Sequence, residues 1–112
     1  MKYIFEVRIK EGHTAEEYAD VWVRASELIQ QASGARGTEL HRKIGDPNTL
    51  IAIASWSSKA ERDAMEVGHN PKIDEIIRSA APFVEVHPLG EFEDPEWVVH
   101  PPGTPGGNNI GF

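Results

Sequence analysis

The segment from Thr49 to Trp56 is apolar on both of its faces, and this constrains the fold more than any other feature of the sequence. Successive side chains of a strand point to opposite faces of its sheet. One face of this segment carries Leu50, Ala52, Ala54 and Trp56, and the other carries Ile51 and Ile53. The pattern therefore predicts a central strand that requires a protein layer on each side of its sheet.

The flanking segments predict the rest of a small α+β domain. Alternation of apolar and polar residues predicts further strands over residues 2–10, 38–44 and 83–92. Capping residues followed by helical spacing predict helices that begin after Thr14, Ser58 and Asn70. Residues 45–48 are typical of a hairpin turn. Pro88 cannot donate to a ladder, so the last strand is expected at an edge or bulged there.

The order strand, helix, strand, strand, helix, strand over residues 1–92 is that of a ferredoxin-like βαββαβ fold with a four-stranded antiparallel sheet. In this topology the helices cover one face of the sheet, and the first and third strands form its centre. The other face is expected to carry Ile4, Ile51, Ile53, Val84 and Val86. Such a face predicts a homodimer in which two sheets pair into a dimeric α/β barrel, and a monomer with scattered surface apolar residues is the alternative.

Residues 93–112 differ in composition from the predicted domain. They contain four of the eight prolines and four of the ten glycines, with Trp97-Val98-Val99 as an apolar cluster. This composition indicates an extended arm, and we expect the arm to pack on the partner subunit of the dimer.

Composition excludes several functional classes. The chain has no cysteine, which rules out a disulfide framework and a thiolate metal site, and 18 acidic against 11 basic residues disfavour a nucleic-acid partner. The five histidines lack the i, i+4 spacing of helical metal ligands, so no metal site is expected. No apolar run approaches the roughly 20 residues of a membrane span, and the first residues lack a secretory signal, so the sequence predicts a cytoplasmic protein.

Several short motifs together resemble the antibiotic biosynthesis monooxygenase domain. They are Asp46-Pro47-Asn48, Ser55-Trp56, Ser58-Lys59-Ala60-Glu61, His69-Asn70-Pro71 and Val84-Glu85-Val86. This family belongs to the dimeric α/β-barrel superfamily, and the resemblance extends from Tyr3 to about Phe92. It implies a pocket between sheet and helices in each subunit. In the best-known enzymes of the family it also implies oxygenation of electron-rich phenols or quinols without a metal or flavin cofactor.

The resemblance implies that Trp56 is a substrate-contacting residue, because it matches the pocket tryptophan of the family. Polyketide-modifying members carry an asparagine four residues earlier, where this chain has Ala52. A small residue there leaves room for a ligand, or for close helix packing. Met65 and Trp22 are further candidates for contact with a small hydrophobic or aromatic ligand, and an ordinary place in the helix core is the alternative for Trp22.

Two histidines are the candidate catalytic residues. His87 shares its alternation with Phe83 and Leu89, so its neutral imidazole is expected to point into an apolar layer and accept a phenol proton. His69 lies at the break between two helical segments, where we expect the rim of the pocket. For both, a hydrogen-bonded or exposed ring is the alternative.

Two functional hypotheses follow from the sequence. The first is a cofactor-independent monooxygenase that acts on a small aromatic or quinol-like metabolite. The second is a non-catalytic dimeric barrel that binds a hydrophobic small molecule or acts as an interaction module. Isomerase or decarboxylase chemistry on a similar ring is a variant of the first.

Overall fold

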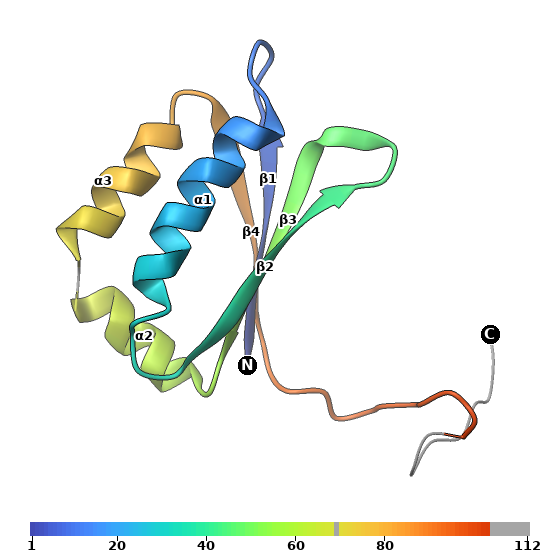
Figure 1. Cartoon of the computed structure of the whole chain (residues 1–112). Coiled ribbons are helices and arrows are strands. Elements are labelled where there is room, and N and C mark those ends of the chain that lie inside the picture. Colours follow the sequence, from blue (N-terminus) through green and yellow to red (C-terminus); the bar gives the residue numbers. More distant parts are fainter. Residues whose placement is uncertain (69, 104–112) are drawn as a thin grey trace.

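The computed structural model describes residues 1–68 and 70–103 of the chain (Figure 1). The strands in these residues are β1 (Lys2–Ile9), β2 (Ala35–Lys43), β3 (Asp46–Trp56) and β4 (Val84–Phe92). The helices are α1 (Ala15–Ile29), α2 (Lys59–Gly68) and α3 (Pro71–Ala80). Strand order in the sheet is β2-β3-β1-β4, with antiparallel pairing throughout. The predicted α+β ferredoxin-like fold, with the first and third strands at its centre, is confirmed.

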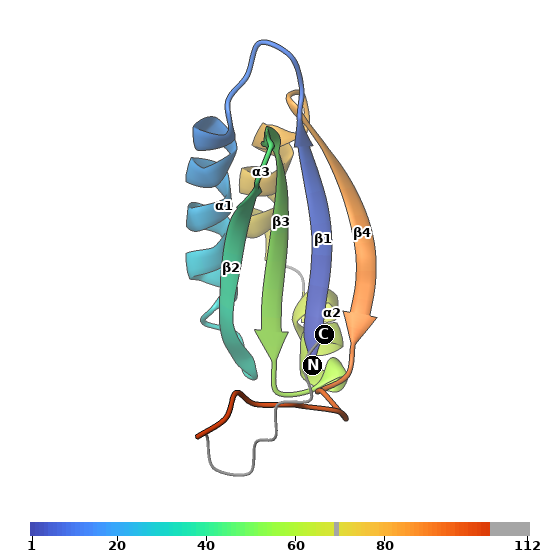
Figure 2. The same cartoon turned by 90° about the vertical axis from the view of Figure 1, so that its right-hand side faces the viewer.

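The three helices lie on one side of the sheet (Figures 1 and 2). We call the helix-covered face the inner face and the opposite face the outer face. Val7 of β1 is fully buried on the inner face, between Leu50 of β3 and Val86 of β4 in the ladder. Both central strands thus direct apolar side chains at the helices, and the core forms in this layer.

Helices α1 and α3 begin at caps that the sequence predicts. Thr14 and Glu17 form a reciprocal capping box, in which the Glu17 amide donates to the Thr14 hydroxyl at 3.2 Å. Asn70 caps α3 by accepting from the Lys72 amide at 2.9 Å, with Pro71 at the first helical position. From α1, the residues Ala15, Tyr18, Val21 and Ala25 are buried against the sheet. The helical spacing of these residues places them in one continuous apolar stripe along α1.

The hairpin between β2 and β3 is tighter than predicted. Lys43 pairs with Asp46, so the turn consists of Ile44 and Gly45 rather than residues 45–48. Gly45 has a φ of 87°, a left-handed conformation that suits glycine. Because the chain reverses its direction at Gly45, Pro47 already lies in β3.

Strand β4 is an edge strand with an irregularity near Pro88, as predicted, but its two faces are the reverse of those expected. Val84 pairs with Ile9, so it lies on the inner face. His87 pairs with Glu6 and lies on the outer face. Side chains of directly paired residues share a face, and the alternation of β4 alone cannot show which of its faces meets the helices. The expectation that His87 points into the apolar layer is therefore wrong.

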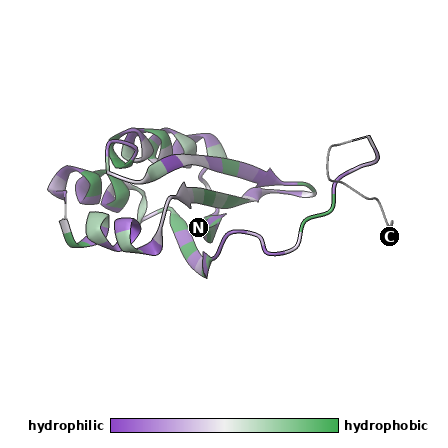
Figure 3. Ribbon diagram, turned by 90° about the horizontal axis from the view of Figure 1, so that it is seen from below, coloured by the Kyte–Doolittle hydropathy of each residue, from purple (hydrophilic) through white to green (hydrophobic). Residues whose placement is uncertain are grey.

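The described part of the arm, residues 93–103, leaves the end of β4 and extends away from the helices on the side of the outer face (Figures 1 and 3). Its apolar cluster is exposed, and the Trp97 side chain is 86% accessible. Figure 3 shows this stretch as a hydrophobic segment outside the helix and sheet layers. Residues 104–112 are outside the described part of the chain, and packing of the arm on a partner stays a prediction.

A glycine joins the loop after α1 to the start of α2. Gly34 has a φ of 84°, and its carbonyl accepts a hydrogen bond from the Ser57 amide at 2.8 Å. The Glu61 side chain packs directly on Gly34 and accepts from the Ser33 hydroxyl at 3.0 Å. Hydrogen bonds from Ser57 and Ser33 hold the pKa of Glu61 below its ordinary value. Any side chain at position 34 would displace this carboxylate from its partners.

We expect Gly34→Ala to lower the free energy of unfolding by about 2 kcal/mol more than Gly45→Ala. Both substitutions place alanine at a positive φ, but a β-carbon at position 34 would lie 2.7 Å from Cβ of Glu61, whereas one at position 45 meets no atom within 4 Å. Urea denaturation of the two variants measures the difference. Equal losses would contradict the proposed steric role of Gly34.

Candidate functional site

A cavity of about 690 Å³ lies between the inner face of the sheet and the three helices. This volume is within the range of small-molecule sites in proteins. Its lining residues are Tyr3, Phe5, Thr38, Ala54, Trp56, Val84 and Val86 from the sheet, and Tyr18, Val21, Trp22, Ala25, Ser26, Ile29, Gln30, Arg62, Met65, Glu66, Asn70, Ile73, Asp74, Ile77, Ala80 and Ala81 from the helices and their ends. Every element except β2 contributes more than one residue.

Five aromatic side chains give the cavity its chemical character. Tyr3 and Phe5 stand on β1 with their ring centroids 5.6 Å apart, and Tyr18, Trp22 and Trp56 complete the set. Aromatic faces and edges stack on flat rings and bury large apolar areas. The lining therefore suits a planar, largely apolar ligand.

Three of the four predicted substrate contacts line this cavity. Trp56 comes from the end of β3, Met65 from the middle of α2, and Trp22 from α1. The fold thus brings together residues that are up to 43 positions apart in the sequence, since 65 − 22 = 43. Trp56 is buried, and Trp22 and Met65 are half-buried.

Ala52 is the fourth predicted contact, and it does not line the cavity. It is fully buried on the inner face, in register between Phe5 of β1 and Leu40 of β2. Ala54, one step further along the same face of β3, lines the cavity instead. Of the two alanines, Ala54 therefore borders the open volume next to Trp56, and Ala52 is packed away from it.

Neither of the two predicted catalytic histidines is among the described residues that line the cavity. His87 is exposed on the outer face, where its Nε2 lies 3.4 Å from a carboxylate oxygen of Glu85. His69 lies outside the described residues. His13, His41 and His100 are exposed elsewhere, and none of the described histidines lines the cavity.

The cavity has polar residues that the sequence patterns did not single out. Glu66 and Asp74 supply carboxylates, and Arg62 supplies a guanidinium. Glu66 directly follows Met65, and Asp74 directly follows the buried Ile73, so their helical positions place them beside the apolar stripe. Periodicity could have indicated this location, but it could not show that the space in front of these residues is open.

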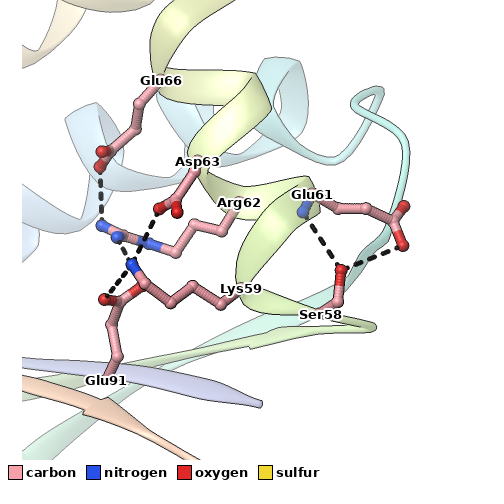
Figure 4. Close-up of polar contacts among 7 residues, drawn as sticks. All are labelled: Ser58, Lys59, Glu61, Arg62, Asp63, Glu66 and Glu91. Atoms are coloured by element: carbon pink, nitrogen blue, oxygen red, sulfur yellow. Dashed lines mark hydrogen bonds and ion pairs between the residues drawn. The ribbon is translucent and has the colours of Figure 1, made fainter.

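Arg62 is the centre of an ionic network that joins α2 to the sheet (Figure 4). Its guanidinium lies 2.8 Å from Glu66 and 3.1 Å from Glu91 of β4, and its Cζ is 3.7 Å from the centroid of the Tyr3 ring. Lys59 also reaches Glu91, at 2.9 Å, and Asp63 at 3.1 Å. Hydrogen bonding from Lys59, supported by Arg62, lowers the pKa of Glu91.

This network matters because α2 has no buried residue of its own. The helix is held at its start by the Glu61 contacts and along its length by Arg62, Lys59 and Glu91. Arg62, Met65 and Glu66 of α2 form one wall of the cavity. The wall thus depends on polar contacts rather than on a deeply packed apolar face.

No group of three or more histidine and acidic side chains in the described part of the chain is arranged to hold a metal ion. No described helix is long and apolar enough to cross a membrane.

The structure defines a ferredoxin-like α+β domain with a cavity between its sheet and its helices, and sequence comparison defines its family. Residues 1–66 match the sequence profile of the antibiotic biosynthesis monooxygenase family. This match includes β1 through most of α2, and with it Trp56, Met65 and Trp22. The chain therefore belongs to the antibiotic biosynthesis monooxygenase family. A comparison with curated proteins produced no significant match.

Solved structures show the same fold at low sequence identity. SnoaB, a cofactor-independent oxygenase from Streptomyces nogalater, is 12% identical, with a TM-score of 0.66 over 86% of this chain and 96% of SnoaB. A candidate antibiotic biosynthesis monooxygenase from Deinococcus radiodurans is 10% identical, with a TM-score of 0.63 over 88% of this chain and 99% of the other. A further one from Nitrosomonas europaea is 12% identical, with a TM-score of 0.61 over 80% and 89%.

We expect Glu91→Gln to loosen α2 and to reduce stability at pH 7, because it removes the carboxylate shared by Lys59 and Arg62. Since the pKa of Glu91 is lowered in the folded state, its contribution is complete above its ordinary value of 4.5 and disappears as the pH falls through the lower folded value. The difference in urea midpoint between wild type and variant should therefore shrink below about pH 4.5.

Glu96→Gln is the matched control, because Glu96 is exposed in the arm. Amide hydrogen exchange should report faster exchange in α2 of Glu91→Gln and unchanged exchange in α1. An equal effect of the two substitutions on α2 would contradict the anchoring role of Glu91.

Proposed function

We propose that the protein is a cofactor-independent monooxygenase that acts on a small aromatic or quinol-like metabolite. The observation that carries the proposal is the aromatic-lined cavity of about 690 Å³ within the fold of this family. Trp56, Trp22 and Met65 are the residues that we assign to contact with the substrate ring. The description of SnoaB as a cofactor-independent oxygenase supports the reaction class.

The proposed chemistry draws its electrons from the substrate. A deprotonated phenol or quinol is electron-rich enough to reduce O₂, so that one oxygen atom enters the product and the other leaves as water. The protein binds the ring, holds the reacting carbon, and excludes bulk water from the reactive intermediate. The largely apolar cavity between the sheet and the helices supports this assignment.

We assign removal of the substrate proton to a group other than His87, because His87 lies on the outer face of the sheet. In the described lining, the carboxylates of Glu66 and Asp74 are the ionisable groups able to accept a proton. Glu66 is paired with Arg62 at 2.8 Å, which positions its carboxylate at the cavity wall. We assign proton acceptance to these carboxylates.

A non-catalytic ligand-binding barrel is the second candidate function. The observation that favours it is the absence of an imidazole from the described cavity lining, together with Ala52 at the position where polyketide-modifying members carry an asparagine. The same cavity would then bind a hydrophobic small molecule without turnover. Oxygen consumption separates the two functions.

We expect the wild-type protein to consume oxygen with at least one member of a panel of quinols and anthrones, and Trp56→Phe to reduce the rate by about tenfold or more through a displaced ring. Trp97→Phe, the same change in the exposed arm, should leave the rate unchanged. An oxygen electrode measures uptake, and mass spectrometry with ¹⁸O₂ measures incorporation.

The outcomes of this experiment distinguish the candidates. No enzyme-dependent uptake across the panel would overturn the oxygenase proposal for those substrates. Ligand-dependent quenching of tryptophan fluorescence without uptake would favour the non-catalytic barrel. Equal rates in the Trp56 and Trp97 variants would remove Trp56 from the site.

We further propose that two copies of the chain pair through their outer faces, as is typical of the superfamily. Ile4, Ile51 and Ile53 lie on this face, and none of the described helices covers it (Figure 2). Val84 and Val86, which the sequence assigned to this face, lie on the inner face and take no part. The arm projects on the side of the outer face, where a partner subunit would meet Trp97, Val98 and Val99.

We expect Ile53→Asp to convert a dimer into a monomer, because it buries a charge at the centre of the proposed interface. Ile44→Asp is the control, since Ile44 is 99% exposed in the hairpin turn and should leave the mass unchanged. Size-exclusion chromatography with light scattering measures both. A monomeric wild type at micromolar concentration would contradict the proposed pairing.

A further inference from the structure

Tyr18 lines the cavity and combines a buried aromatic ring with a hydroxyl group. Its side chain is 8% exposed, and it packs in the core cluster with Val7, Ile9 and Val84 while also lining the cavity. None of the described residues accepts a hydrogen bond from its hydroxyl, and the hydroxyl oxygen is not sealed away from open space. Because the rest of the side chain packs in the core, the cavity is the open space that Tyr18 borders.

Several other polar groups of the lining have partners within the protein. The Gln30 Oε1 atom accepts from the Gly37 amide at 2.7 Å, and the Thr38 hydroxyl donates to the Ile53 carbonyl at 3.2 Å. Arg62 is paired with two carboxylates. The hydroxyl of Tyr18 has no such partner among the described residues, although a phenylalanine would fill the same space in the core.

The protonation state of Tyr18 defines what it can recognise. Burial raises its pKa to about 12, so the phenol stays neutral and retains its proton at any physiological pH. A neutral phenol donates one hydrogen bond and is a poor base. Its counterpart in a ligand is therefore an oxygen that accepts, such as a ring carbonyl or a phenolate.

We propose that the hydroxyl of Tyr18 donates a hydrogen bond to a carbonyl or phenolate oxygen of the aromatic ligand and thereby sets the orientation of the ring in the cavity. This inference rests on the proposed function, because it assigns a recognition contact within the same site. It makes Tyr18 a positioning residue that selects oxygen-bearing rings over hydrocarbon rings of the same shape. The hydrophobic lining supplies affinity, and Tyr18 supplies discrimination.

A pair of ligands that differ by one carbonyl oxygen tests the inference. The probes are 1-tetralone, an aromatic ketone, and tetralin, which has a methylene at the same position. Isothermal titration calorimetry of the full chain should show that Tyr18→Phe weakens 1-tetralone binding by roughly tenfold and leaves tetralin binding unchanged. The unliganded variant should be about as stable as wild type in urea, because it keeps the ring that packs in the core and loses no hydrogen bond to the described residues.

Each other outcome overturns a specific claim. Equal weakening of both ligands would show that Tyr18 serves packing alone, and no change in either would show that its hydroxyl does not meet the ligand. Both results would overturn the inference while leaving the proposed aromatic site intact. Failure of the wild type to bind 1-tetralone, tetralin or anthrone would contradict the proposed ligand class, and the inference with it.

Discussion

The pairing of β1 with both β3 and β4 is the interaction on which the rest of the structure depends. Its register sets Val7 opposite Leu50 on one side and Val86 on the other, so that three strands direct apolar side chains at the helices together. A slip by one residue would send these side chains to the outer face and bring Glu6 and Arg8 into the core. The same register places Tyr3 and Phe5 at the cavity and His87 away from it.

The cavity is lined by both large and small residues, which together do not fill it. Tyr3, Phe5 and Trp56 are bulky, while Ala54 lies between them in the sheet and Ala25 opposite in α1. Protein cores usually close such gaps, because lost contacts reduce stability. Retention of this volume beside three half-buried or buried aromatic residues is consistent with a ligand that completes the packing.

The two ends of the helical layer are held by different forces. Helix α1 is held by a buried stripe, whereas α2 is held by Arg62, Lys59 and Glu91, and by Glu61 at its start. Ion pairs at a surface contribute less than buried apolar area and weaken with salt. The α2 wall of the cavity is thus held by weaker contacts than the α1 wall.

Much of the fold followed from sequence alone, because strand alternation, helical spacing and capping residues are local properties. The doubly apolar segment ending at Trp56 predicted a central strand, and Pro88 predicted the irregular edge strand.

The family resemblance indicated Trp56 as a site residue, but the rest of the site could be identified only from the tertiary structure. Alternation in β4 defines two faces without saying which meets the helices, so His87 was assigned to the wrong one. Nor can periodicity distinguish a filled position, such as Ala52, from one that borders open space, such as Ala54. Tyr18 has the helical spacing of an ordinary core residue, and only the packed structure shows that it also borders a cavity and that its hydroxyl has no partner among the described residues.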